Sequence, residues 1–279
     1  MKFNVSAHLE YTTTEPCTFI LNIHTLDKPD SLIKESFRAD PVFPVEILAP
    51  SREGNRLVRI TMDKPGSVRF YYQALVQNSF TLINFKNETP TAISALDPSV
   101  FTYLNPSRYC QSDKLYRLAN HQFGKIENEF SKVVAISEWI NQNVEYLSGS
   151  TNAETSAYDT VTQQAGVCRD FAHLGIALCR ALTIPARYCS VYAYQLEPQD
   201  FHACFEAYLS GNWIIFDATK LAPLNGLIKI AVGRDAADTA IANLFGDVMG
   251  NGIVVNSTLA GENFEPLFYH PGDWLGISY

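Results

Sequence analysis

Residues 165–174 are Ala165-Gly166-Val167-Cys168-Arg169-Asp170-Phe171-Ala172-His173-Leu174, and this stretch decides the fold of the chain. Gly166 interrupts the segment before it, and apolar residues then recur at helical spacing as far as Leu182. We therefore predict a helix that begins at Cys168 and buries one face. The positive end of the helix dipole favours the thiolate of a cysteine on the first turn, and the thiolate is the nucleophilic form of cysteine.

A predicted hairpin downstream carries a histidine and an aspartate. Its strands cover residues 201–209 and 213–219, and residues 210–212 form the turn. If Tyr208 pairs with Trp213, Asp217 lies opposite Cys204 and on the same face as His202. The Asp217–His202 diagonal is then roughly 7–8 Å between backbones, within reach of a side-chain contact. A two-residue loop at residues 211–212 keeps the face but separates the pair by two more residues, so both registers stay open.

These three side chains have the chemistry of a nucleophilic triad. Cys168 would be the nucleophile, His202 the general base and then the acid, and Asp217 the group that orients the imidazole. Each residue taken alone has a structural interpretation: a buried thiol, a strand histidine, a carboxylate that caps a turn. The order Cys, His, Asp along one chain favours the catalytic interpretation.

The chain resembles the bacterial transglutaminase-like proteins, which belong to the papain-like superfamily of Cys-His-Asp enzymes. The resemblance rests on the block around Cys168, on His202, on Phe-Asp-Ala-Thr at 216–219, and on further blocks at 103–107, 184–188 and 232–235. It covers roughly residues 100–245, with a weaker likeness before them. The resemblance implies an α+β fold. A papain/transglutaminase-like core of helices and antiparallel sheet would follow an all-β, sandwich-like N-terminal domain.

We predict two domains, a β-rich one over residues 1–95 and a catalytic one over 96–279 that includes a C-terminal extension. Short segments with β-branched and aromatic residues, bounded by Pro, Asp, Asn and Gly, predict the N-terminal strands. They are residues 17–24, 42–48, 56–62 and 67–74. Helical spacing predicts helices over 113–123, 129–147 and 158–164. Strands are also predicted over 188–194 and 227–232, and the extension could add a strand to either domain.

Composition excludes several classes of function. The formal net charge is −8 with no basic run, which argues against nucleic acid and anionic membranes as partners. Residues 1–10 contain no apolar segment of the signal-peptide type, so we expect a cytoplasmic protein. The six cysteines form no Cys-x-x-Cys pair, and no acidic cluster has calcium-ligand spacing. We expect no cofactor and no metal site, and we make no prediction of the oligomeric state.

Several residues near the predicted triad have secondary roles in this interpretation. His173 is the rival base, but it lies about 140° round the helix from Cys168, so a structural role is favoured. Arg169 and Asp170 are predicted to support neighbouring elements. Arg187, Arg234 and Asp235 are predicted to form a buried ion-pair network. The backbone N–H of Cys168 is expected in the oxyanion hole. The second donor stays open among Tyr158, Gln163 and Gln164.

The expected function is that of a cysteine peptidase or amidase that transfers an acyl group from a peptide or protein amide through a Cys168 thioester. We favour water as the acceptor because bulk water always competes. A protein-glutamine transglutaminase with an amine acceptor would use the same triad. A non-catalytic binding module that retains the fold is a further alternative, and a metal site made by the three triad residues is a weaker one.

Overall fold

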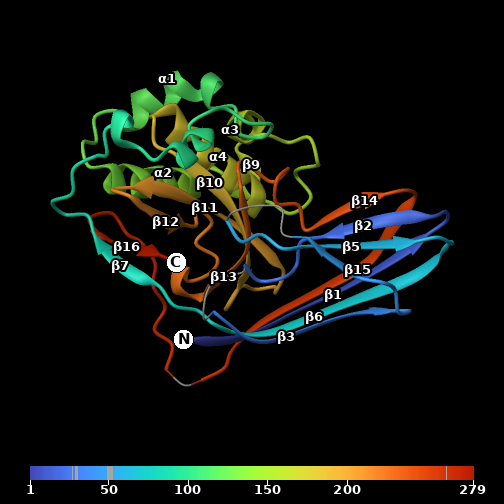
Figure 1. Cartoon of the computed structure of the whole chain (residues 1–279). Coiled ribbons are helices and arrows are strands. Elements are labelled where there is room, and N and C mark those ends of the chain that lie inside the picture. The colour runs from blue at the N-terminus through green and yellow to red at the C-terminus, as the bar shows by residue number, and fades with distance from the viewer. Residues whose placement is uncertain (27, 29–30, 49–52, 262) are drawn as a thin grey trace.

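The computed structural model describes residues 1–26, 28, 31–48, 53–261 and 263–279. It consists of a sheet-rich part, built mostly from the N-terminal residues, and a mixed part in which helices α1–α4 cover an antiparallel sheet (Figure 1). The predicted α+β class and the sheet-rich N-terminal part are confirmed.

The first sheet of the sheet-rich part has the strand order β15-β1-β6-β3, with all neighbours antiparallel. Its strands are β1 (Lys2–Thr13), β3 (Leu32–Asp40), β6 (Gly66–Gln77) and β15 (Val248–Leu259). Every second residue of β1 is buried, from Phe3 onward, as the two-residue period of a strand with one covered face requires. The sequence analysis predicted neither β1 nor β3.

The second sheet has the order β14-β2-β5-β4 and faces the first across a shared apolar core. Its strands are β2 (Cys17–Leu21), β4 (Glu46–Leu48), β5 (Leu57–Met62) and β14 (Ala242–Phe245). Phe19 links the sheets, since its ring lies 5.3 Å from that of Tyr11 and 5.2 Å from that of Phe70. The segment after the mixed part therefore returns to complete both sheets.

The mixed part is organised around helix α4 (Cys168–Ala181), in which every residue from Asp170 onward is buried. Around it pack α1 (Ser112–Phe123), α2 (Glu129–Asn143) and α3 (Ala157–Gln163). Arg180, near the end of α4, donates to the backbone carbonyls of Ala186 (2.8 Å) and Arg234 (2.6 Å). The predicted helix over 129–147 ends early, at Asn143, because the residues after it pair as a strand.

The sheet beside α4 has the order β12-β11-β10-β13. Its strands are β10 (Ala186–Ala193), β11 (Phe201–Leu209), β12 (Asn212–Phe216) and β13 (Leu227–Gly233). Tyr208 pairs with Trp213, which is the first of the two registers considered from the sequence. The turn is only two residues long, Ser210 and Gly211, and both have positive φ (46° and 84°), as a type I′ hairpin turn requires.

Two small pairings complete the fold. β7 (Thr81–Asn84) is antiparallel to β16 (Leu275–Ser278), so the end of the C-terminal segment lies on the linker between the two parts. β8 (Glu145–Tyr146) is parallel to β9 (Ala165–Gly166), which places Tyr146 beside the residues that precede Cys168.

Candidate active site

Cys168 lies at the first position of α4 and is half-buried, whereas the other five cysteines are buried. The turn before it is fixed by Asp170, whose Oδ2 accepts the backbone N–H of Val167 at 2.9 Å. Gly166 is required here because a Cβ on it would lie 2.8 Å from the Cβ of Asp170. The thiol therefore stands at the positive end of a buried helix, on a turn with little freedom.

A glycine also sets the distance between α4 and the strand that carries His202. A Cβ on Gly175 would lie 2.5 Å from Cε1 of Phe205, well inside van der Waals contact. Phe205 is fully buried and stacks on Phe216, with 5.6 Å between ring centroids. The backbone of α4 therefore packs directly on an aromatic ring of β11, three residues after His202.

His202 and Asp217 form a buried pair. Nε2 of His202 lies 2.8 Å from Oδ2 of Asp217, and each side chain is 1% exposed. The other carboxylate oxygen of Asp217 accepts the backbone N–H of Thr219 at 2.9 Å and its hydroxyl at 2.7 Å. Both oxygens of Asp217 thus have donors, and Nδ1 is the ring nitrogen left to His202 for other partners.

The third member of the predicted set lies beside this pair. The Cys168 side chain lies next to that of His202 and interacts with its ring. Burial alone would lower the pKa of His202, but the Asp217 carboxylate and the Cys168 thiolate outweigh it and raise the pKa to about 10. The structure therefore brings Cys168, His202 and Asp217 together, and the arrangement favours the imidazolium form of His202.

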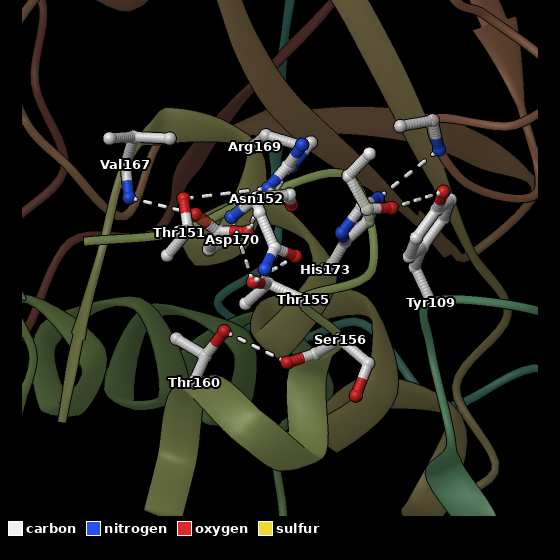
Figure 2. Close-up of polar contacts among 12 residues, drawn as sticks. Tyr109, Thr151, Asn152, Thr155, Ser156, Thr160, Val167, Arg169, Asp170 and His173 are labelled. Atoms are coloured by element: carbon white, nitrogen blue, oxygen red, sulfur yellow. Dashed lines mark hydrogen bonds and ion pairs between the residues drawn. The ribbon is translucent and has the colours of Figure 1, made fainter. Parts of the chain in front are cut away.

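Arg169 and Asp170, the two residues after Cys168, form a cluster of polar contacts with the loop before α3 (Figure 2). Arg169 pairs with Oδ1 of Asp170 at 3.0 Å and also donates to the carbonyl of Asn152 at 2.7 Å and to the hydroxyl of Thr151 at 3.4 Å. The loop after β8 is thereby tied to the first turn of α4.

His173 lies in an aromatic setting, between Tyr109 and Tyr188. Its ring stacks on Tyr109 with 5.0 Å between centroids and an interplanar angle of 7°, and Nε2 accepts the backbone N–H of Ala236 at 3.1 Å (Figure 2). Burial, followed by the nearby Arg169 and Arg180, holds the pKa of His173 well below its usual range. A neutral, stacked ring with its Nε2 already engaged fits a structural role.

The predicted network of Arg187, Arg234 and Asp235 is wrong as a single unit. Arg187 donates to the fully buried Glu206 at 2.7 Å, and Lys229 also pairs with that carboxylate. These two cations outweigh burial and lower the pKa of Glu206 to about 2.

The other two residues lie elsewhere. Arg234 is exposed and pairs with Asp238 at 2.8 Å, four residues along the chain. Asp235 accepts the backbone N–H of Tyr109 at 3.0 Å. Sequence could not separate these arrangements, because Glu206 and Lys229 lie inside apolar strands and were not considered as partners.

The three candidates for a second oxyanion donor all have exposed side chains. The ring of Tyr158 is exposed and lies 5.2 Å from Nζ of Lys114, and Gln163 and Gln164 are exposed. A residue that the sequence analysis passed over, Tyr146, lies beside the nucleophile: it pairs with Gly166, two residues before Cys168, and its phenol interacts with the Cys168 side chain. The available signal was the alternation of Val144, Glu145 and Tyr146 directly after an asparagine, which favours a strand over a helix end.

The described residues contain no group of three or more His, Cys, Asp or Glu side chains placed to hold a metal ion. Within the same part of the chain, no helix combines the length and the apolar character that crossing a bilayer requires.

Comparison with known proteins agrees with this geometry. Residues 116–218 match the transglutaminase-like superfamily core, and residues 1–99 match the N-terminal domain of bacterial transglutaminases. The solved structure of a "putative cysteine protease" from Cytophaga hutchinsonii is 49% identical, covers 100% of this chain and 97% of its own, and superposes with a TM-score of 0.97. The chain belongs to the transglutaminase-like superfamily.

A curated relative is similar over a shorter stretch. An uncharacterized protein of Mycobacterium leprae (strain TN) is 29% identical over 146 residues, which are 49% of this chain and 52% of that protein. The match thus spans about half the length of this relative.

Proposed function

We propose that this protein is a cysteine peptidase or amidase, in which Cys168 takes an acyl group from a peptide or protein amide and water accepts it. The observation that carries the proposal is the His202–Asp217 pair, with 2.8 Å between Nε2 and Oδ2, held against the thiol of Cys168 at the start of α4. A buried imidazole with one nitrogen on a carboxylate and the other near a thiol is suited to move a proton between sulfur and a leaving group.

The proposed reaction has two halves. In the first, His202 holds the thiol proton, the thiolate attacks the amide carbonyl, and the imidazolium protonates the departing amine to leave a thioester on Cys168. In the second, neutral His202 takes a proton from water, which attacks the thioester and releases the acid. Asp217 keeps the ring in one tautomer and stabilises the imidazolium in both halves.

The thiol chemistry is tested by alkylation with iodoacetamide at a series of pH values, with the label assigned to each cysteine by peptide mass spectrometry. Selective labelling of Cys168 well below pH 8.5 is expected, since its partner is an imidazolium. The five buried cysteines serve as internal controls. His202→Gln is the matched variant because its side-chain amide can still donate to Asp217. Loss of low-pH labelling in that variant would support the pair, and labelling no faster than that of a free thiol would contradict the proposal.

The acceptor is tested separately with a library of peptides, in the presence and absence of a primary amine. Cleaved peptides that depend on Cys168 support hydrolysis, whereas amine incorporated at glutamine side chains would assign the protein as a transglutaminase. A reactive thiol with no turnover on either set would favour a binding module that retains the fold. Cys168→Ala should abolish turnover while leaving the unfolding transition near that of the wild type.

A further inference from the structure

The side chain of Tyr146 occupies the space beside the reacting sulfur. It lies close enough to Cys168 for the thiol and the backbone of that residue to influence the pKa of the phenol. Its ring packs on Phe171, one turn into α4, with 5.8 Å between centroids.

The backbone of Tyr146 is fixed to the strand that leads into Cys168. In the parallel β8–β9 pairing, Tyr146 stands opposite Gly166. The N–H of Leu147 donates to the carbonyl of Gly166 at 3.0 Å, and the N–H of Glu145 donates to that of Gln164 at 2.8 Å. A shift of the nucleophile turn would therefore carry Tyr146 with it, which keeps the two groups in register.

The loop that follows is held from the other side. Arg169, the residue after the nucleophile, donates to the carbonyl of Asn152 and the hydroxyl of Thr151 (Figure 2). Asp170 in turn orients Arg169 and caps the turn at Val167. Residues on both sides of Cys168 thus hold the segment that carries Tyr146, as expected for a group whose position matters to within a fraction of an ångström.

The chemical state of the phenol suits a donor. Partial burial, followed by the neighbouring Cys168 thiolate, raises the pKa of Tyr146 to about 12, so the hydroxyl keeps its proton at any working pH. The residue is nevertheless 42% exposed, so an incoming molecule can reach it. A neutral hydroxyl beside the nucleophile can donate a hydrogen bond to negative charge on the sulfur, or to negative charge on the carbonyl oxygen once the C–S bond has formed.

We propose that the hydroxyl of Tyr146 and the backbone N–H of Cys168 together form the oxyanion hole, a deeper description of the site that rests on the proposed function. When the thiolate attacks, the C–S bond forms and the carbonyl π electrons move to oxygen, where both groups donate to the new charge. When those electrons return, the C–N bond breaks, and the amine departs with the proton from His202. Because Tyr146 already lies beside the sulfur before the attack, the donor needs no large movement to reach the new oxyanion.

The test compares two reactions of the same thiol. Alkylation by iodoacetamide displaces iodide and forms no oxyanion, whereas acylation by p-nitrophenyl acetate does. Both rates are measured at the plateau of their pH profiles for wild type, Tyr146→Phe and the control Tyr158→Phe, which removes a hydroxyl from an exposed tyrosine of the same region. Tyr146→Phe keeps the ring on Phe171. We expect its acylation rate to fall about 100-fold with alkylation within about twofold of wild type, and Tyr158→Phe to change neither.

Three other results would contradict the assignment of the Tyr146 hydroxyl to the oxyanion hole. Acylation of Tyr146→Phe within threefold of wild type would show that the hydroxyl has no part in the transition state. Equal losses in acylation and alkylation would mean that it acts on the thiolate alone. A wild-type protein that is neither alkylated selectively at Cys168 nor acylated there would refute the proposed function itself, which separates that failure from a failure of Tyr146.

Discussion

Gly175→Ala should push the catalytic helix away from the strand that carries His202. The added Cβ would stand 2.5 Å from Cε1, 2.8 Å from Cζ and 2.9 Å from Cδ1 of Phe205. Carbon atoms prefer about 3.5 Å or more, so the two elements must separate by about 1 Å. Phe205 cannot turn aside, because it is fully buried and stacked on Phe216.

Two magnitudes follow from this contact. Overpacking of a core costs about 1–3 kcal/mol, and the better helix propensity of alanine returns about 1 kcal/mol, so the free energy of unfolding should fall by at most about 2 kcal/mol. A misplacement of about 1 Å at a reacting group can cost about 100-fold in rate. We therefore expect a small loss of stability, measured by urea unfolding, and a much larger loss in the low-pH alkylation rate of Cys168.

A compensating variant separates this cause from a general weakening of the fold. Phe205→Leu removes Cε1 and Cζ, so the double variant Gly175→Ala/Phe205→Leu should alkylate faster than Gly175→Ala alone, although it has lost apolar contacts of its own. The reasoning is refuted if Gly175→Ala unfolds at the same urea concentration as wild type and alkylates at the same rate. It is also refuted if the second substitution only adds to the damage.

Three further changes test other parts of the structure. Asp217→Ala should slow low-pH alkylation of Cys168 less than His202→Gln does, because the imidazole remains next to the sulfur; an equal or larger loss would contradict the assigned roles. Burial, followed by Arg56, lowers the pKa of His24 to about 4 from 6.5, so the folded state binds fewer protons than the unfolded chain between these values. Stability should thus be full above pH 6.5 and fall by about 3 kcal/mol as the pH drops to about 4, and urea unfolding of His24→Phe should lack that part of the decline. Glu206→Gln leaves Arg187 and Lys229 without their buried counter-charge and should destabilise the fold by about 3–5 kcal/mol; urea unfolding within about 1 kcal/mol of wild type would show that neither cation depends on it.

The elements that could be predicted from the sequence are those determined by residues within the same short segment. The helix at Cys168 follows from a glycine, an acidic first turn and a regular apolar stripe. The hairpin follows from a turn of small and polar residues between two apolar runs, whereas its register stayed open between two choices until the structure paired Tyr208 with Trp213. In these segments local preference and tertiary packing agree.

The elements that sequence could not predict depend on distant partners. Tyr146 was assigned to the end of a helix because the strand it forms is two residues long and exists only through pairing with β9. The strand predicted over residues 17–24 ends at Leu21, and His24 beyond it is 3% exposed, with 4.5 Å between the centroids of its ring and that of Tyr72. In both places a contact made far along the chain overrides the local pattern.

The pairing of β15 with β1 has a consequence for how the chain folds. Phe3 stands opposite Leu259 and Thr13 opposite Val248, so these partners are separated by roughly 250 residues. Pairing over such a distance is slow, because the chain between the partners loses conformational entropy before the contacts that compensate for this loss have formed. The mixed part, whose sheet pairs segments close in sequence, can assemble first. Until β14 and β15 arrive, β2 and β1 present open backbone edges, which are the places where one chain can join another. Aggregation during refolding should therefore compete with the late pairing of β14 and β15. Because aggregation needs two chains and the pairing only one, a lower protein concentration should raise the yield of native protein.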